Sequence, residues 1–547
     1  MSTSDFETMH TENQYNLRNE LKNYHKISPR HTLTIETDMS YSNVLKIIKV
    51  SEQIRKESNE LTRLMLDNYT QLLRTKRYRK LLLLYGKAKD KHAKKTYATQ
   101  LNDMQYKYNL TWEYCRKSMI RIGKSYNIDA VLGLSQAENV WKGVEKCLYS
   151  NGKKLHFYKH GELLSLRAKQ FDRCIYITSY EDKITFQFRK IKFGLKIKDR
   201  FQKDELDAIS NYLSNSEKIN IQSLNLYHDI GIITSTYRPC YATLVPKKIR
   251  GKYRIFLHIM IEGLAKPKYN KDGTLRHKYG TGIIGADIGT QTVAYTSETE
   301  VALKNLSERG NSIKISERKE KLLYRAMDRS RRSTNPKNYN PDRTIRKGRK
   351  IWHKSKHYKK LQKKHAELCR KNAINRQLAI NEEANHLRSI GDTFITEPKN
   401  SKKLMQRAKK TSINKNGKIN KKKRFGKSIR NRCPGLFQAT VENKFKNTGG
   451  KYIEVPEYYR ASQYDHIADK YIKKKLSDRM FNLSDGTLVQ RDWYSSFLLY
   501  CYDINSCTID KNKCKLEFEK QYERELLLID WIIKNKIKIL NSGLKFT

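Results

Sequence analysis

Three acidic residues stand at the ends of apolar or helical patterns, where carboxylates can do metal chemistry. Asp287 follows an apolar strand-like run, Glu397 ends another such run far along the chain, and Asp492 precedes a helical pattern. An ionised carboxylate beside apolar residues is costly unless it binds a cation or accepts hydrogen bonds. Two divalent cations about 3.5–4 Å apart need carboxylate oxygens from several elements to clamp a phosphodiester. The three acids therefore predict a Mg²⁺ site, with Mn²⁺ as an alternative ion, that hydrolyses nucleic acid.

Each acid also has a structural interpretation. Asp287 could be a structural or capping residue, and a single Asp at the position of Asp492 is more often the N-cap of a helix than a metal ligand. Spacing along the sequence does not prove that the three side chains converge.

The sequence pattern around Asp287 indicates that it belongs to an α/β domain. Gly289 allows a tight turn from the strand 282–288 into a second strand at 292–296. RNase H-like nucleases and actin-like ATPases both begin with this topology.

The rest of the chain divides by its periodicity. A polar segment covers 1–30 and a short strand pattern follows at 31–36. Apolar residues recur at helical spacing from 44 to 148, and strand-like runs occupy 174–178, 184–188, 240–245 and 253–261, the last two forming a hairpin through Gly251. Two long helices are predicted within 306–390, a basic loop at 399–432 and a terminal helix at 516–540.

The charge points to a polyanionic partner. The 547 residues include 112 Lys and Arg against 56 Asp and Glu, a formal net charge of +56 that is spread along most of the chain. Such a surface repels itself unless nucleic acid or another polyanion is bound. No apolar run is long enough to cross a bilayer and the N-terminus is polar, so no membrane association and an intracellular, cytoplasmic location are expected.

These motifs resemble those of the TnpB family, transposon-encoded RNA-guided DNA endonucleases related to the type V CRISPR effectors. The segments 285–289 (GADIG), 395–400 (ITEPKN) and 490–492 (QRD) are similar, in order, to the three RuvC motifs of that family. The helical pair between the first two motifs has the family's layout, and 165–167 (SLR) resembles its segment before the β-barrel.

The resemblance implies an α/β multidomain protein. It implies a helical recognition lobe at 42–150, a wedge β-barrel at 151–282 joined by a first strand at 31–41, and an RNase H-like (RuvC) nuclease domain at 283–504, followed by a C-terminal helical extension at 505–547. Its implied partners are a guide RNA from the transposon end and target double-stranded DNA, in a prokaryotic, nucleoid-associated setting. The nucleic-acid contacts it favours are Arg325, Arg329, Arg331, Arg332, Arg167 and Lys169.

Two features depart from the family. Members often carry a four-Cys zinc module between the second and third motifs, whereas this chain has no cysteine between Cys433 and Cys501. Tyr494 also replaces the usual Asn two residues after the third acid. The combination resembles a zinc-free branch, so no zinc is expected.

Three other functions fit part of the pattern. A nuclease-inactive relative would be an RNA-guided DNA-binding repressor, although all three acids remain. An actin-like or sugar-kinase ATPase would need a second Gly-rich phosphate loop, which the sequence lacks, and a DNA-strand transferase also uses three acids. The guide sequence, the adjacent motif, the cut pattern and the oligomeric state are not predicted.

Overall fold

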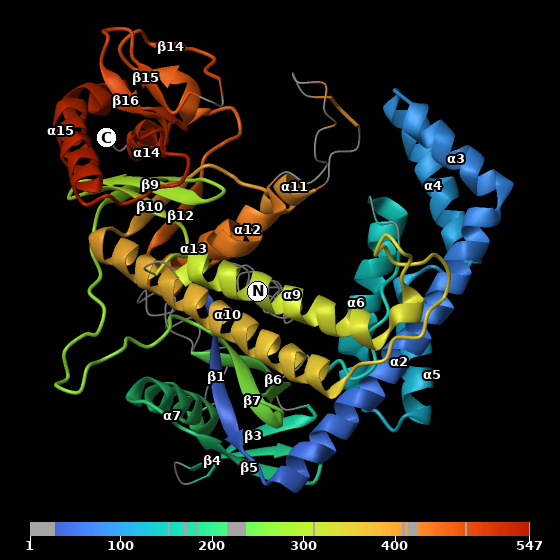
Figure 1. The fold of residues 1–547 in the computed structure, drawn as a ribbon. Helices are drawn as coiled ribbons and strands as arrows, with labels where there is room; N and C mark the ends of the chain where they lie inside the picture. Colours follow the sequence, from blue (N-terminus) through green and yellow to red (C-terminus); the bar gives the residue numbers. More distant parts are fainter. Residues whose placement is uncertain are drawn as a thin grey trace, which may run out of the picture. The chain divides into compact units, whose positions relative to one another are not determined.

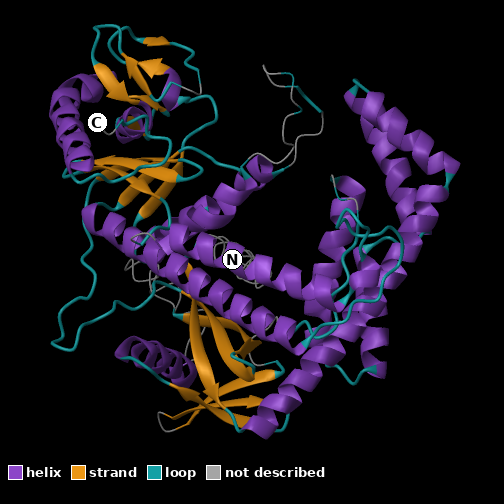
Figure 2. Cartoon of the chain, in the orientation of Figure 1, coloured by secondary structure: helices purple, strands orange, loops and turns teal. Residues whose placement is uncertain are grey.

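The structure is a computed structural model that describes residues 28–150, 152, 154–168, 173–180, 183–215, 237–309, 312–406, 411–413, 417, 419, 425–475 and 478–545. The chain forms two compact units, Met1–Lys268 and Tyr269–Thr547. Figure 1 gives the order of the elements and Figure 2 their type. Within the described residues, no helix is both long and apolar enough to cross a membrane.

The first unit contains a seven-stranded antiparallel sheet in the order β2-β6-β7-β1-β5-β4-β3. The strands are β1 (Arg30–Asp38), β2 (Leu166–Arg167), β3 (Ile175–Tyr180), β4 (Lys183–Phe188), β5 (Ile191–Lys196), β6 (Arg238–Ile249) and β7 (Lys252–Glu262). β1 lies between β7 and β5, so the first strand of the described residues joins two groups of later strands. The strand predicted near residue 31 is therefore the strand that connects β2, β6 and β7 with β5, β4 and β3 in one sheet.

The β6–β7 hairpin confirms the prediction of a turn at Gly251. Ile249 pairs with Lys252, and the two residues between them, Arg250 and Gly251, have φ of 49° and 87°. Positive φ at both central positions is typical of type I′ hairpin turns.

A helical lobe follows β1. It contains α2 (Tyr41–Arg74), α3 (Lys76–Lys87), α4 (Lys91–Lys107), α5 (Trp112–Ser125) and α6 (Ala130–Tyr149). α2 serves two cores, because Ile47 and Ile54 pack with the sheet whereas Leu61 and Met65 pack with the other helices. α7 (Arg200–Asn215), which the periodicity did not predict, contributes Ile209 to the sheet core.

The second unit is built on a mixed five-stranded sheet in the order β10-β9-β8-β11-β12. The strands are β8 (Ile283–Ile288), β9 (Thr292–Ser297), β10 (Val301–Asn305), β11 (Thr393–Thr396) and β12 (Lys451–Glu454). β8, β9 and β10 are antiparallel neighbours, whereas β11 runs parallel to both β8 and β12. The predicted turn from β8 into β9 is confirmed, and in it Gly289 N donates to Thr292 O at 2.7 Å.

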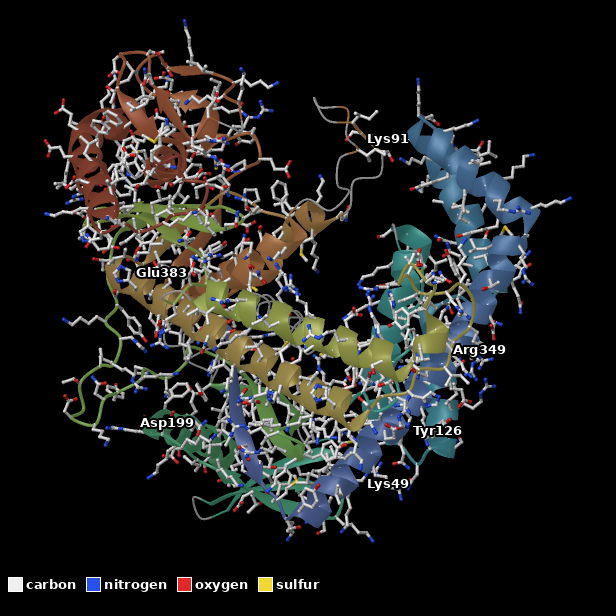
Figure 3. All side chains as sticks on the ribbon, viewed as in Figure 1. Lys49, Lys91, Tyr126, Asp199, Arg349 and Glu383 are labelled. Atoms are coloured by element: carbon white, nitrogen blue, oxygen red, sulfur yellow. The ribbon has the colours of Figure 1, made fainter. Side chains whose placement is uncertain are left out.

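Helices cover both faces of this sheet. One face packs against α10 (Lys356–Ile390) and α13 (Pro434–Asn447), with Ile284 and Ala286 of β8 in their core. The other face packs against α14 (Arg491–Tyr500) and, through Ile532, against α15 (Lys511–Lys534). Glu383 of α10, labelled in Figure 3, pairs with Lys304 of β10 at 3.0 Å.

The chain between β10 and β11 forms two helices, α9 (Ser312–Thr334) and α10, as predicted. The basic segment 399–432 is not one loop, because α11 (Ser401–Met405) begins it and α12 (Gly426–Arg432) ends it. After β12, the short strands β13 (Tyr464–Asp465), β14 (Lys470–Tyr471), β15 (Met480–Asn482) and β16 (Leu488–Gln490) lead into α14.

Candidate active site

Asp287 and Glu397 occupy equivalent positions on neighbouring parallel strands. In the register of β8 and β11 the last pair is Ala286 and Thr396, and the next residue on each strand is Asp287 or Glu397. Thr396 Oγ1 also donates to Ala286 O at 2.8 Å. Parallel pairing therefore brings these two carboxyl groups to the same edge of the sheet, although they are far apart in sequence.

Both side chains point to the face that carries α14. Successive residues of a strand face opposite sides, and Ile284, Ala286 and Phe394 lie in the core with α10 and α13. Ile395 lies in the core with α14. Glu397 is two residues after Ile395 and therefore lies on the same face as Ile395, which is the α14 face. Asp287 is one residue after Ala286 and therefore lies on the opposite face from Ala286, which is again the α14 face.

α14 supplies the third acid at its first turn. Gln490 is the N-cap of this helix, and its side chain accepts a hydrogen bond from Trp493 N at 2.7 Å. Asp492 is thus not the capping residue, which removes the structural interpretation of an N-cap. Glu525 of α15 accepts from Gln490 N at 2.9 Å, so the C-terminal helix holds the start of α14.

Gly285 lets α14 lie directly on β8. A Cβ at this position would be 2.0 Å from Tyr500 N and 2.4 Å from Ser496 O. Gly285 is two residues before Asp287 on the same face, so the end of α14 rests on Gly285 and its start lies toward the carboxyl end of β8.

The electrostatics of the acids show their proximity. Burial raises the pKa of Asp492 to about 6, and the negative charge of Asp287 adds to this effect. The pKa of Glu397 is also raised, first by burial and then by Asp287. Asp287 is therefore close enough to both other carboxylates to penalise their ionisation, as expected of acids grouped around a cation site.

Three protein groups partly offset this negative charge. Lys399 Nζ lies 3.6 Å from Asp287 Oδ1, Arg479 Nη1 lies 3.4 Å from Asp492 Oδ1, and Ala461 N donates to Glu397 Oε1 at 3.1 Å. Lys399 and Arg479 were not predicted as site residues. The position of Lys399, two residues after the second acid, was the available sequence signal for it.

The donor set fits a hard divalent cation. All three groups are carboxylates, and oxygen is the ligand that Mg²⁺ prefers. Their oxygens do not all lie within 4.8 Å of one another in the described structure, and cationic side chains lie beside two of them. Asp287, Glu397 and Asp492 are the residues that would hold the ion, and Asp287 and Asp492 would turn toward it from their cationic neighbours.

The predicted nucleic-acid residues of α9 differ in their surroundings. Arg325 and Arg329 are exposed. Arg331 and Arg332 both form ion pairs with Asp328 at 2.8 Å while keeping about 37% and 40% of their side chains exposed.

Of the two predicted residues near β2, one is described. Arg167 lies over the Tyr241 ring at 4.4 Å and lines a cavity of about 350 Å³ with Ser165 and His258. Lys169 lies outside the described residues.

The segment that lacks the four-Cys module contains a hydrogen-bonded aromatic cluster. His466 N donates to the Tyr494 hydroxyl at 3.1 Å, and the His466 ring lies 4.4 Å from the Phe518 ring. Asp465 accepts from Ser484 N at 3.0 Å and from Ser484 Oγ at 2.7 Å. Tyr494, the residue that departs from the third motif, is therefore a buried hydrogen-bond partner of this segment.

Neither a protein-family model nor a curated protein matches the chain. Among solved structures, the chain is similar to one in a Cas12f1-sgRNA-target DNA complex, with 12% identity, 82% of each chain covered and a TM-score of 0.41. A CRISPR-Cas12f ternary complex has 12% identity over 83% of this chain and 82% of that chain, with a TM-score of 0.24. A Cas12i1 R-loop complex before target DNA cleavage has 9% identity, 78% and 56% coverage and a TM-score of 0.24.

Proposed function

We propose that this protein is an RNA-guided, Mg²⁺-dependent DNA endonuclease, encoded by a transposable element and similar to a zinc-free branch of the TnpB family. It would cut DNA next to a short adjacent motif. The observation that carries the proposal is the grouping of Asp287, Glu397 and Asp492 on one face of a mixed sheet, at the carboxyl end of its central parallel strands. Three antiparallel strands followed by two parallel ones support an RNase H-like (RuvC) domain.

The acids have separate positions around the proposed ion site. Asp287 and Glu397 come from rigid paired strands, whereas Asp492 comes from a helix fixed by its Gln490 cap and by contact with Gly285. Bound Mg²⁺ would supply activation of water and stabilisation of the leaving oxygen. Lys399 and Arg479 would then be free to release their carboxylates and face the phosphate backbone.

The charge of the chain supports nucleic-acid partners. A net charge of +56 would allow electrostatic contacts with the phosphate backbone of a guide–target heteroduplex. Base pairing between guide and target would carry the sequence information. The proposed contacts remain exposed Arg325 and Arg329 on α9, with Arg331, Arg332, Arg167 and Lys169, of which Lys169 lies outside the described residues.

The test is the activity of the protein purified with its own RNA. The RNA that co-purifies with the protein is sequenced. DNA that matches the end of this RNA that varies in sequence is then incubated with the complex in Mg²⁺ or in EDTA. Cleavage only in Mg²⁺ and only of matched DNA supports the proposal. Tight binding of matched DNA without cleavage favours the repressor, joined products favour a strand transferase, and ATP turnover without nucleic acid favours the ATPase.

A further inference from the structure

A second group of metal-ligating side chains lies between α9 and α10, outside the three-acid site. Glu320 comes from α9, and His365 and Cys369 come from α10 with the i,i+4 spacing that places two side chains on one helix face. Of the residues that the structure describes, these three form the one group of His, Cys, Asp or Glu ligands whose atoms all lie within 4.8 Å of one another.

Two of the separations between these ligand atoms have the length of an edge of a tetrahedral zinc site. Zn²⁺ binds sulfur at about 2.3 Å and nitrogen or oxygen at about 2.0–2.2 Å, so two ligand atoms in a tetrahedron are about 3.4–3.6 Å apart. His365 Nε2 lies 3.5 Å from Glu320 Oε1 and 3.6 Å from Cys369 Sγ. Cys369 Sγ also lies 3.9 Å from His365 Nδ1, so rotation of the Cys369 side chain must bring the sulfur in front of Nε2 when the ion binds.

The surroundings hold two of the ligands in place. Arg430 of α12 binds Glu320 Oε2 at 3.1 Å, which leaves Oε1 directed to His365. The ring of Tyr324 packs against the His365 ring with centroids 4.7 Å apart. Partners of this kind orient metal ligands in known sites.

A cavity beside the group leaves room for a fourth ligand. It has a volume of about 140 Å³ and is lined by Glu320, Cys369, Asn372 and Arg430 among others. This volume exceeds what one ordered water needs, so water can complete the coordination.

We propose that Glu320, His365 and Cys369 bind a Zn²⁺ ion that fastens α9 to α10. A thiolate, an imidazole and a carboxylate form a mixed donor set that suits Zn²⁺ better than Mg²⁺. The Cys369 thiol gives up its proton when it binds, and the ion is held only by the folded chain. The expectation of a zinc-free protein came from a segment between the second and third motifs, whereas this site lies between the first and second.

The site would stabilise the helix pair that carries Arg325 and Arg329. Glu320 lies on the same helix as these two residues, and its ligand partners lie on the neighbouring helix. This role goes beyond cleavage and does not depend on it.

Cobalt binding tests the site. The whole protein is stripped with a chelator, dialysed and titrated with Co²⁺ alone, followed by Zn²⁺. We expect one equivalent of Co²⁺ to give the near-ultraviolet charge-transfer absorption of a cobalt–thiolate bond, and Zn²⁺ to abolish it. The three-acid site has no sulfur, so it does not contribute to this absorption.

Substitutions assign the absorption to these residues. We expect Cys369→Ser to eliminate it, and Glu320→Gln or His365→Gln to weaken Co²⁺ binding by about 100-fold or more. Cys507→Ser, which removes a partly buried thiol from another part of the second unit, is the control and should leave the absorption intact. Far-ultraviolet circular dichroism verifies that each variant is folded. A folded wild-type protein without the absorption, or an absorption that persists in Cys369→Ser, would overturn the proposal and leave Glu320 and His365 as an ordinary ion pair.

Discussion

At the scale of single residues, Asp492 lowers the stability of the protein when no cation is bound. Burial and the charge of Asp287 raise the pKa of Asp492 from 3.8 to about 6, so near neutral pH the folded state holds an ionised carboxylate against its preference. By linkage, this shift lowers the folding stability near neutral pH, because the unfolded chain ionises Asp492 without the same cost.

Asp492→Asn should therefore raise the unfolding temperature in metal-free buffer, because the amide removes this repulsion. Mg²⁺ should raise the unfolding temperature of the wild type and have little effect on the variant, since a ligand that binds only the folded state stabilises it. Thermal unfolding with and without Mg²⁺ measures both effects. Equal stabilisation of the two proteins by Mg²⁺ would contradict binding at Asp492.

Residue types along the sequence predicted the acids but not the cations beside them. Asp287, Glu397 and Asp492 each end a recognisable pattern, and the strand register and helix cap bring them to one face. Lys399 and Arg479 are two among 112 basic residues. Only the folded structure distinguishes Arg479, whereas the position of Lys399 two residues after Glu397 was a local signal.

At the scale of elements, the contact between α14 and β8 determines the site. A side chain at Gly285 would collide with the backbone of α14, at 2.0 Å from Tyr500 N. Gly285→Ala should displace the helix that carries Asp492, abolish cleavage and lower the free energy of unfolding by about 3 kcal/mol or more.

Gly426→Ala is the control for this substitution, because a Cβ at Gly426 meets no atom within 4 Å. Cleavage and chemical denaturation of the two variants should be compared with those of the wild type. If Gly285→Ala behaves like Gly426→Ala, α14 is not held against the sheet at this point.

The helical lobe contains a buried acid that should make its stability depend on pH. Glu57 of α2 lies in the lobe core, and neither of its oxygens has a hydrogen-bond partner among the described residues. A Cβ at Gly123 of α5 would be 2.6 Å from Glu57 Oε1, which shows how closely the helices surround it. Burial, and then the charge of Glu60, raises the pKa of Glu57 from 4.5 to about 8.

The sign of the effect follows from proton binding. Between pH 4.5 and about 8 the folded lobe keeps a proton on Glu57 that the unfolded chain releases, so stability falls as pH rises through this window. Glu57→Gln should flatten this part of the pH dependence. Helical unfolding followed by circular dichroism from pH 4 to pH 9 measures it, and an unchanged slope in the variant would show that Glu57 is not the responsible group.

Local patterns predicted most strands and helices. The β6–β7 hairpin has long alternating strands and a glycine turn. The 16-residue helix α7 was missed although Leu206, Ile209 and Leu213 recur on one of its faces at helical spacing. Among the described residues of the second unit, three loops share a turn that spacing alone did not reveal. In each, an Asp accepts hydrogen bonds from both N and Oγ1 of a Thr two residues later, at Asp272–Thr274, Asp342–Thr344 and Asp485–Thr487.

At the scale of the whole molecule, net charge should dominate the affinity for nucleic acid. Each phosphate contact that neutralises the backbone steepens the salt dependence of binding by about one unit of log K per unit of log salt. Replacing exposed Arg325 and Arg329 together by Ala should therefore reduce the slope by about two and weaken binding similarly for all sequences.

The matched control removes two exposed lysines from a different helix, as Lys511→Ala with Lys520→Ala on α15. Binding of the protein to a labelled duplex over a range of salt concentrations gives the slopes. Equal slopes for the two double variants would mean that α9 does not contact the backbone preferentially.

The order of strands in each sheet was beyond what the sequence could predict. β1 pairs with β7 and β5. β8 pairs with β11, although the helices α9 and α10 lie between these two strands in the sequence. Such pairings depend on tertiary packing between segments that are far apart, whereas periodicity reports only local conformation.

Cleavage of matched DNA by the protein–RNA complex tests the central claim most directly. The wild type and Asp287→Ala, Glu397→Ala and Asp492→Ala are each purified with their RNA, and binding and cutting of the same matched DNA are measured in Mg²⁺. We predict that all four bind the DNA with nearly equal affinity and that only the wild type cuts it. Cutting by any of the three variants at the wild-type rate, or loss of binding in all three, would contradict the assignment of these carboxylates to the catalytic site.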